Sequence, residues 1–271
     1  MLNANILKVR HAGFDQAKKL ELYIEKCDVF SIEAAGAGEN EVRKAEDLYE
    51  LALKGEPLKP FSDYVGLTEG GRIRAEYNAT QMAYLLNHKK PIWLVERLTD
   101  EEFGSLVPLE TDDGKFLSRY LYSIDDGDIE EVVANYLKHL DIGRQKADVR
   151  DKNIARNLET AEEKIKTRYH HLRDRSVIDL GICIGAEHRP EKYLRNGLPI
   201  IANPIDLRGQ PESISEILEH AYSENDSLER LRYLVLAFTV DFLGEDKIQS
   251  TDILKMTERN LTQFIISRKK K

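Results

Sequence analysis

The sequence predicts an α/β protein with a central, mostly parallel sheet flanked by helices, followed by a helical C-terminal region. Three observations predict this class. Short apolar runs rich in β-branched residues alternate with segments of helical periodicity. The first two of these runs both fall within residues 1–33, so the chain returns quickly to the sheet. After residue 210 only helical periodicity remains.

Composition bounds the class of protein. The 271 residues are enough for one large domain or two small ones, and 41% hydrophobic with 32% charged residues is a globular balance. A net charge of −8 argues against bulk attraction to nucleic acid or an anionic membrane. The expected partner is a small-molecule or peptide substrate, and a homo-oligomer remains compatible with the sequence. Cys27 and Cys183 lie in apolar runs without CxxC spacing and are predicted to be reduced core thiols.

Targeting signals are not evident in the sequence. Residues 1–10 contain neither a basic segment nor an apolar core of a signal peptide, and no apolar run approaches the roughly 18 residues that a membrane span needs. The predicted location is therefore cytoplasmic.

The first strand is expected over residues 6–9, and a helix over 14–26 follows it. The second strand, 28–32, ends directly at Glu33. So short a return is typical of a βαβ unit, whose two strands are parallel neighbours. Helices over 40–54 and 72–88 then lead into a third strand, 92–95, which ends on Glu96 and Arg97.

The second half of the chain continues the alternation. Residues 99–128 are acidic, contain glycines and have weak periodicity, which predicts an irregular excursion, with a lid as one interpretation. The elements expected after it are helices over 129–140 and 151–169, a central strand over 177–184, and a last strand over 198–202 closed by Asn203-Pro204. The helical tail is expected over 212–223, 227–242 and 250–267. We therefore predict an α/β core over 1–210 and a helical extension over 211–271 packed on it.

Polar residues follow the predicted strands. They are His11, Glu33, Glu96 with Arg97, and Glu187 with His188. The C-terminal ends of parallel strands share the sheet edge at which open α/β proteins bind ligands, so these residues are expected to converge. Imidazole and carboxylate transfer protons near neutral pH and also bind divalent ions. His11, Glu33 and His188 could together hold one manganese, cobalt or zinc ion with positions left for water.

Each of these residues also has a structural interpretation, because a single strand-end histidine or glutamate is usually a surface or hydrogen-bonded residue. Arg150 and Asp151 are open to two interpretations. They could cap the N-terminus of a helix, or Arg150 could orient a strand-end carboxylate or bind a substrate anion.

The ordered motifs resemble a known superfamily. The motifs are the strand before His11, the strand ending at Glu33, residues 91–97, the Arg150-Asp151 helix segment and residues 184–188. Together they resemble the superfamily of TraB/PrgY pheromone-shutdown proteins, Tiki metalloproteases, erythromycin esterases and ChaN-like haem-binding proteins. The chain departs from the pattern in having no glycine three residues before His11, and in carrying Glu96 in place of aspartate and Ile154 in place of methionine.

This resemblance implies a metal-assisted or His/Glu-assisted hydrolase. Glu33 would be the general base or a metal ligand, and His11 and His188 would be metal ligands or proton carriers, with Glu96 and Arg150 supporting them. The hydrolase hypothesis requires the Glu33 carboxylate to lie within about 8 Å of one of the two imidazoles. Two alternatives stay open: a non-catalytic binding or regulatory protein, and a partner-docking role for residues 99–128 and the helical tail.

Overall fold

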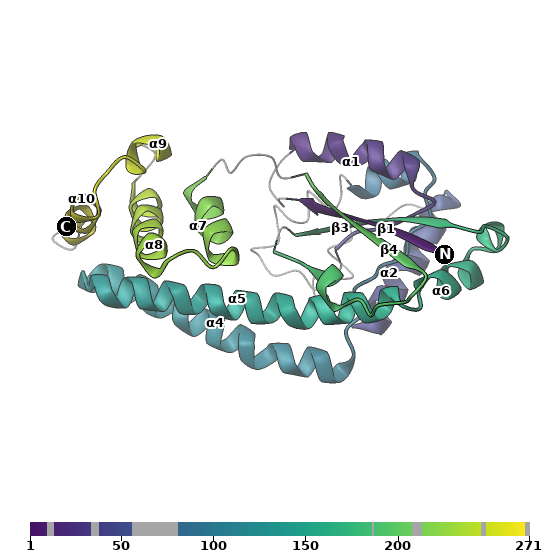
Figure 1. The fold of residues 1–271 in the computed structure, drawn as a ribbon, viewed down its shortest axis with the longest axis horizontal. Helices are drawn as coiled ribbons and strands as arrows, with labels where there is room; N and C mark the ends of the chain where they lie inside the picture. The colour runs from purple at the N-terminus through teal and green to yellow at the C-terminus, as the bar shows by residue number, and fades with distance from the viewer. Residues whose placement is uncertain are drawn as a thin grey trace. The chain divides into compact units, whose positions relative to one another are not determined.

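The computed structural model describes residues 1–9, 14–33, 38–55, 81–185, 187–207, 213–244 and 248–268. Its centre is a four-stranded, all-parallel sheet with strand order β2-β3-β1-β4 (Figure 1). The strands are β1 (Leu2–Val9), β2 (Val29–Ser31), β3 (Ile178–Gly185) and β4 (Ile200–Asp206). The predicted fold class, a parallel sheet flanked by helices, is confirmed.

The predicted neighbour relation of the first two strands is wrong. β3 lies between β1 and β2 and pairs with both, from Leu2↔Ile178 on one side to Ser31↔Ile182 on the other. Every residue of β3 except Asp179 is buried, and a strand apolar on both faces belongs at the centre of a sheet. The strands remain parallel, so their C-terminal ends share one edge.

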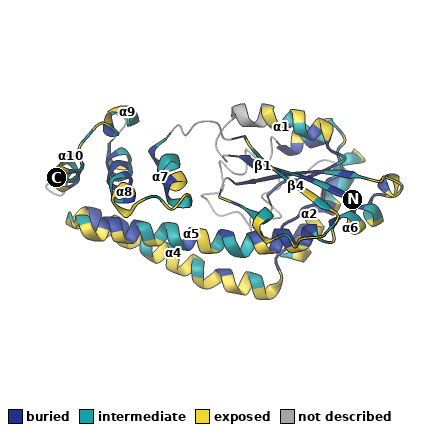
Figure 2. Cartoon of the chain, in the orientation of Figure 1, coloured by how far each residue is buried: buried dark blue, intermediate teal, exposed yellow. Residues whose placement is uncertain are grey.

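Helices cover both faces of the sheet. On one face, α1 (Phe14–Lys26), α2 (Glu39–Leu53) and a helix over residues 81–87 pack on Leu7, Val9 and Phe30. On the other face, residues from the end of α5 (Ile129–Leu158) and from α6 (Ala161–Arg168) pack on Leu2, Ala4, Ile6 and the alternate residues of β3. Strands β1, β2 and β3 are therefore mostly buried, whereas every residue of the edge strand β4 is partly or fully exposed (Figure 2). Residues 72–80 of the predicted third helix lie outside the described residues.

Both cysteines belong to this core. Cys27 and Cys183 are buried free thiols, as predicted. Burial is the main cause that raises the pKa of the Cys27 thiol to about 12, so this group stays neutral at physiological pH.

Residues 92–95 are extended beside β2 but are joined to it by an isolated bridge, Phe30↔Ile92, rather than a full ladder. Side chains bind much of the backbone of this segment instead. Glu46 accepts the Leu94 N–H at 2.7 Å, Ser31 Oγ accepts the Val95 N–H at 3.0 Å, and Asn157 donates to the Val95 carbonyl at 2.9 Å. The predicted third strand is thus corrected to an extended segment held largely by polar side chains, which satisfy its buried backbone groups.

The predicted irregular excursion over 99–128 is also wrong, because most of it forms one helix, α4 (Asp100–Asp126). Thr99 and Glu102 start this helix with reciprocal bonds: the Glu102 N–H donates to Thr99 Oγ1, and the Thr99 N–H donates to the Glu102 carboxylate. Buried Tyr120 and Ile124 anchor its last turns. Tertiary packing outweighs the unfavourable glycines and Pro108, and the lid interpretation loses its basis.

The helices expected over 129–140 and 151–169 have other bounds in the structure, where α5 runs unbroken from Ile129 to Leu158 and α6 starts separately at Ala161. Asp151 is therefore inside a helix and cannot be its N-cap, which corrects the capping interpretation. Two short 3₁₀ segments follow at His170–Leu172 and Pro190–Tyr193. The last strand, β4, continues through Pro204 to Asp206, because an edge strand tolerates a residue without an N–H donor.

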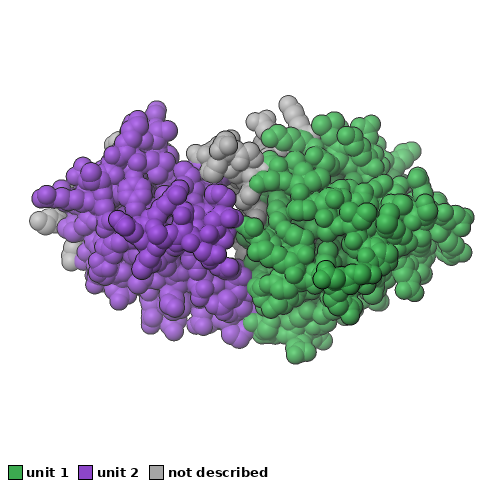
Figure 3. All heavy atoms as spheres, in the orientation of Figure 1, with its two compact units in different colours: residues 1–105, 147–209 green, residues 106–146, 210–271 purple. Residues whose placement is uncertain are grey.

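The chain divides into two compact units (Figure 3). Unit 1 comprises residues 1–105 and 147–209 and contains the sheet, whereas unit 2 comprises 106–146 and 210–271. The C-terminal helices are α7 (Ile214–Ser223), α8 (Leu228–Leu243), α9 (Ser250–Ile253) and α10 (Glu258–Arg268). They share an apolar core with residues of α4 and α5, including Tyr136 and Val235. Within the described ranges, no helix combines the length and apolarity needed to cross a membrane.

Gly181 in β3 offers a direct test of the packing beside the sheet, where Phe30 and Cys27 lie close to it. A Cβ atom built there would lie 2.6 Å from Cδ2 of Phe30 and 2.8 Å from Sγ of Cys27. We expect Gly181→Ala to lower the free energy of unfolding by about 1–3 kcal/mol, because an overpacked core must shift. Urea unfolding measures the change. The control is Gly114→Ala in α4, where nothing lies within 4 Å and where alanine should stabilise the helix. Equal effects of the two substitutions would contradict the packing.

Candidate functional site

Four polar groups lie together at the C-terminal edge of the sheet. Glu33 follows β2, Glu96 follows the extended segment 92–95, and His188 lies in the turn after β3. Arg150 comes to them from α5 and contacts two of the three. His11, the fourth strand-end residue predicted from sequence, lies outside the described residues.

Arg150 links the two carboxylates. Its Nη2 donates to Glu33 Oε1 at 2.5 Å, and its Nε donates to Glu96 Oε1 at 2.6 Å. The side chains of Glu33 and Glu96 are 4% and 1% exposed, so the pairs are shielded from water. Burial lowers the pKa of the Arg150 guanidinium, but the charges of Glu96 and Glu33 outweigh burial and raise that pKa well above its usual value. Arg150 is therefore a permanent cation, with its side chain 14% exposed, that orients both carboxylates.

A backbone N–H group also binds the carboxylate of Glu33. Its Oε2 accepts the Gly185 N–H at 2.9 Å, at the end of β3. One carboxylate oxygen thus contacts the guanidinium of Arg150 while the other binds the neighbouring strand, so the orientation of Glu33 is determined from two sides.

His188 is fully buried and held by Asp151. Its Nδ1 lies 2.7 Å from Asp151 Oδ1, and the second oxygen of Asp151 accepts the Arg189 N–H at 2.7 Å. Its Nε2 has no hydrogen-bond partner among the described residues. The carboxylate oxygens near this nitrogen are Glu187 Oε1 at 3.6 Å and Glu33 Oε1 at 3.8 Å. Since buried polar groups are normally satisfied, this nitrogen marks His188 as a residue with more than a packing role.

The protonation of His188 follows from its neighbours. Burial lowers its pKa, and so does the positive charge of Arg150 on α5. Asp151 on the same helix, Glu33 after β2 and Glu187 in the histidine's own turn act in the opposite direction, and their combined effect raises the pKa of His188 to about 10. His188 therefore keeps its proton at neutral pH, beside the carboxylate of Glu33.

Arg97, predicted from sequence to join this group, does not do so. Its side chain turns away to α2, where Nη2 pairs with buried Glu46, and the guanidinium lies 5.0 Å from the Trp93 ring centroid. The backbone of Arg97 is nevertheless tied to the site helix, because Asn153 accepts its N–H at 2.9 Å and donates to its carbonyl at 2.7 Å. Asn153 was not among the predicted residues. Its position three residues after Arg150 was the available signal, since residues three apart share a helix face.

The described residues do not by themselves fit a divalent metal ion. No group of three or more histidine, cysteine, aspartate or glutamate side chains within the described ranges could hold one. Of the three proposed ligands, Glu33 contacts the cation Arg150, whose charge would repel a metal at the same oxygen. His188 would have to lose the proton on Nε2 before this nitrogen could bind a metal ion, and His11 lies outside the described residues.

No protein-family model, curated protein or solved structure matches this chain. The fold and the site define it as a parallel α/β protein with a buried cluster of one arginine, two glutamates and an Asp–His pair at the C-terminal sheet edge.

Proposed function

We propose that this protein is a hydrolase in which Glu33 and His188 activate water at the C-terminal edge of the sheet. The observation that carries the proposal is the position of buried His188 between Asp151 and Glu33. Its Nδ1 is bound to Asp151, whereas its Nε2 faces Glu33 and has no hydrogen-bond partner among the described residues. Desolvated groups with perturbed pKa values cluster at catalytic sites. The resemblance of the ordered motifs to esterases and Tiki proteases supports the same reaction class.

The two side chains would divide the proton transfers. A separation of 3.8 Å between Glu33 Oε1 and His188 Nε2 allows one water molecule to hydrogen-bond to both atoms from the side. Glu33, an oriented carboxylate, would accept a proton from that water as it attacks a carbonyl carbon. His188, which carries a proton at neutral pH, would donate to the leaving group. Asp151 would then hold the imidazole in place, and Arg150 would hold Glu33.

A non-catalytic binding or regulatory protein is the alternative. Such a protein would not need an acid and a base at this distance, and the separation is well inside the limit of about 8 Å beyond which one water cannot reach both groups. This short separation therefore favours a catalytic role over binding alone.

The test is hydrolysis of a panel of p-nitrophenyl esters, lactones and short peptides by the purified chain. We expect turnover of at least one class, with loss of turnover in Glu33→Gln and His188→Asn. Turnover that is the same in the wild type and both variants would come from elsewhere and would refute the proposal.

Metal dependence is a separate prediction with its own measurement. The wild type, Glu33→Ala and His188→Ala are titrated with manganese, cobalt and zinc by calorimetry. If the site holds a metal through these side chains, both variants should bind at least about tenfold more weakly, as losing a ligand usually does. Equal binding by all three proteins would rule out a metal ion held by Glu33 and His188. The reaction by the His/Glu pair, which needs no metal ion, would be unaffected by that result.

A further inference from the structure

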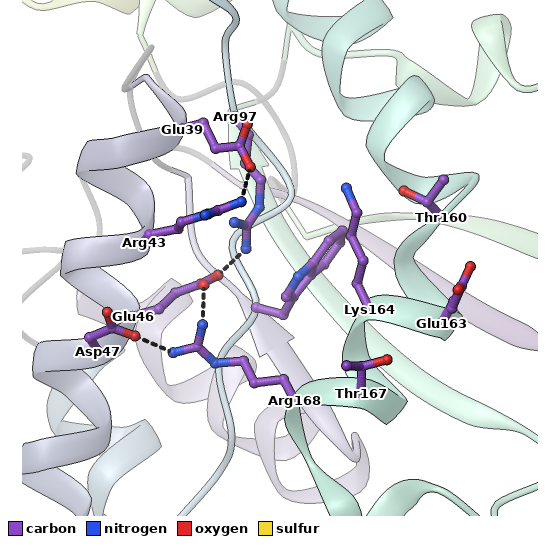
Figure 4. Close-up of a pocket in the computed structure, with 11 residues that line it drawn as sticks. Glu39, Arg43, Glu46, Asp47, Arg97, Thr160, Glu163, Lys164, Thr167 and Arg168 are labelled. Carbon is purple, nitrogen blue, oxygen red and sulfur yellow. Dashed lines mark hydrogen bonds and ion pairs between the residues drawn. The ribbon is translucent and has the colours of Figure 1, made fainter.

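A cleft of about 500 Å³ lies between α2 and α6 in unit 1, away from the Arg150 cluster, and Trp93 and Arg97 help to line it. Figure 4 shows its side chains: Arg43 reaches in from α2, Lys164 comes from α6, and Arg97 lies between them. A volume of this size is typical of small-molecule sites.

Arg97 is a preorganised donor in this cleft. It is only 8% exposed, its Nε donates to the Leu94 carbonyl at 2.8 Å, and its Nη2 pairs with Glu46. Its Cζ lies over the Trp93 ring, in a cation–π contact that also favours this position of the guanidinium. No bond from Nη1 to another described residue is present, so part of a rigid guanidinium is left to meet a ligand.

The other cations of the cleft differ in how far they are neutralised. Arg168 is committed to Glu46, Asp47 and a further glutamate of α2. Arg43 makes one exposed pair with Glu39, of a kind worth little in water. The ammonium group of Lys164 makes no ion pair or hydrogen bond with the described residues, although exposed Glu163 adjoins Lys164 in sequence. Arg97, Arg43 and Lys164 therefore remain able to bind an anion.

We propose that this cleft binds a small molecule through a phosphate group, with Arg97 as the fixed contact and Arg43 and Lys164 closing on it from α2 and α6. Hydrogen-bond donors on three separate elements approach a ligand from different directions, as the oxygens of a tetrahedral phosphate require. A planar carboxylate needs only two donors in its own plane. Arg97 and Glu96 are adjacent, so the cleft and the Arg150 cluster share one chain segment while using different side chains.

The experiment is calorimetric titration of the full chain with inorganic phosphate, and with acetate at matched ionic strength. We expect saturable one-site binding of phosphate that is tighter than binding of acetate. Lys164→Gln should weaken phosphate binding by about tenfold, the value of one charge-assisted contact. Arg97 itself is unsuited to substitution, since its loss would disturb buried Glu46, so the exposed lysine is the better probe.

Two matched variants keep the result specific. Lys166→Gln removes the same charge from the same helix, but Lys166 pairs with Glu162 and does not line the cleft, so this variant should change the affinity by less than about twofold. Glu163→Gln removes a carboxylate from the cleft and should strengthen binding. Absence of saturable binding up to about 20 mM phosphate, or equal weakening by Lys164→Gln and Lys166→Gln, would overturn the proposal.

Discussion

Replacing Arg150 by glutamine is expected to lower the free energy of unfolding by about 3–5 kcal/mol, because it removes the cation that neutralises the buried carboxylates of Glu33 and Glu96. Both carboxylates are almost fully buried, so water cannot take over the role of the guanidinium without opening the sheet edge. The measurement is equilibrium unfolding in urea followed by circular dichroism at pH 7.

A matched control lies on the same helix. Lys152 makes an exposed pair with Asp148, and Lys152→Gln should change stability by no more than about 0.5 kcal/mol. The triple variant Arg150→Gln, Glu33→Gln, Glu96→Gln removes both negative charges together with the positive one. It should recover part of the lost stability, because the penalty comes from the uncompensated charge. If Arg150→Gln and Lys152→Gln are equally mild, the carboxylates are not held by Arg150 in solution.

Substitutions at the acid–base pair are expected to have the larger effect on activity. Glu33→Gln keeps the shape of the side chain and an oxygen for the Gly185 N–H, but it removes the proton acceptor. His188→Asn keeps a donor toward Asp151 and removes the proton on Nε2. We expect each to lower kcat/KM by about 10²–10⁴-fold, the contribution of one general acid or base. Initial rates on the substrate found in the panel give these values.

The same types of substitution made elsewhere in the protein serve as controls. They distinguish a loss of catalysis from general effects of a changed charge or of misfolding. Glu25→Gln and His171→Asn alter exposed residues that make no hydrogen bond or ion pair with the site residues, and they should leave kcat/KM within about twofold. Circular dichroism checks that the four variants keep the wild-type spectrum. A folded Glu33→Gln or His188→Asn protein with full turnover would contradict the assigned roles.

Much of the fold can be predicted from short stretches of the sequence. Runs such as 28–32 and 177–184 are apolar and β-branched, and polar residues end them, so their strand character and the positions of Glu33 and His188 were readable without tertiary information. Residues 99–128 were not readable in this way. Their glycines, Pro108 and acidic residues mask a helix, whose buried residues Tyr120 and Ile124 belong to the apolar core of unit 2.

The partners of the site residues needed the structure. Asp151 was placed at a helix start by its local pattern, yet it lies within α5 and binds His188, which is 37 residues later in the chain. Glu96 and Arg97 are adjacent and similar in local context, but the extended backbone sends one to Arg150 and the other to Glu46 and Trp93.

The sequence by itself determined that Glu33 and His188 closely follow strands, because strand and turn preferences act over a few neighbouring residues. Only the tertiary structure decided that β3 separates β1 from β2, that Arg150 holds two carboxylates, and that Arg97 belongs to a separate cleft. Those arrangements depend on contacts between residues far apart in the chain, whose energies come from packing and buried charge rather than from local propensity.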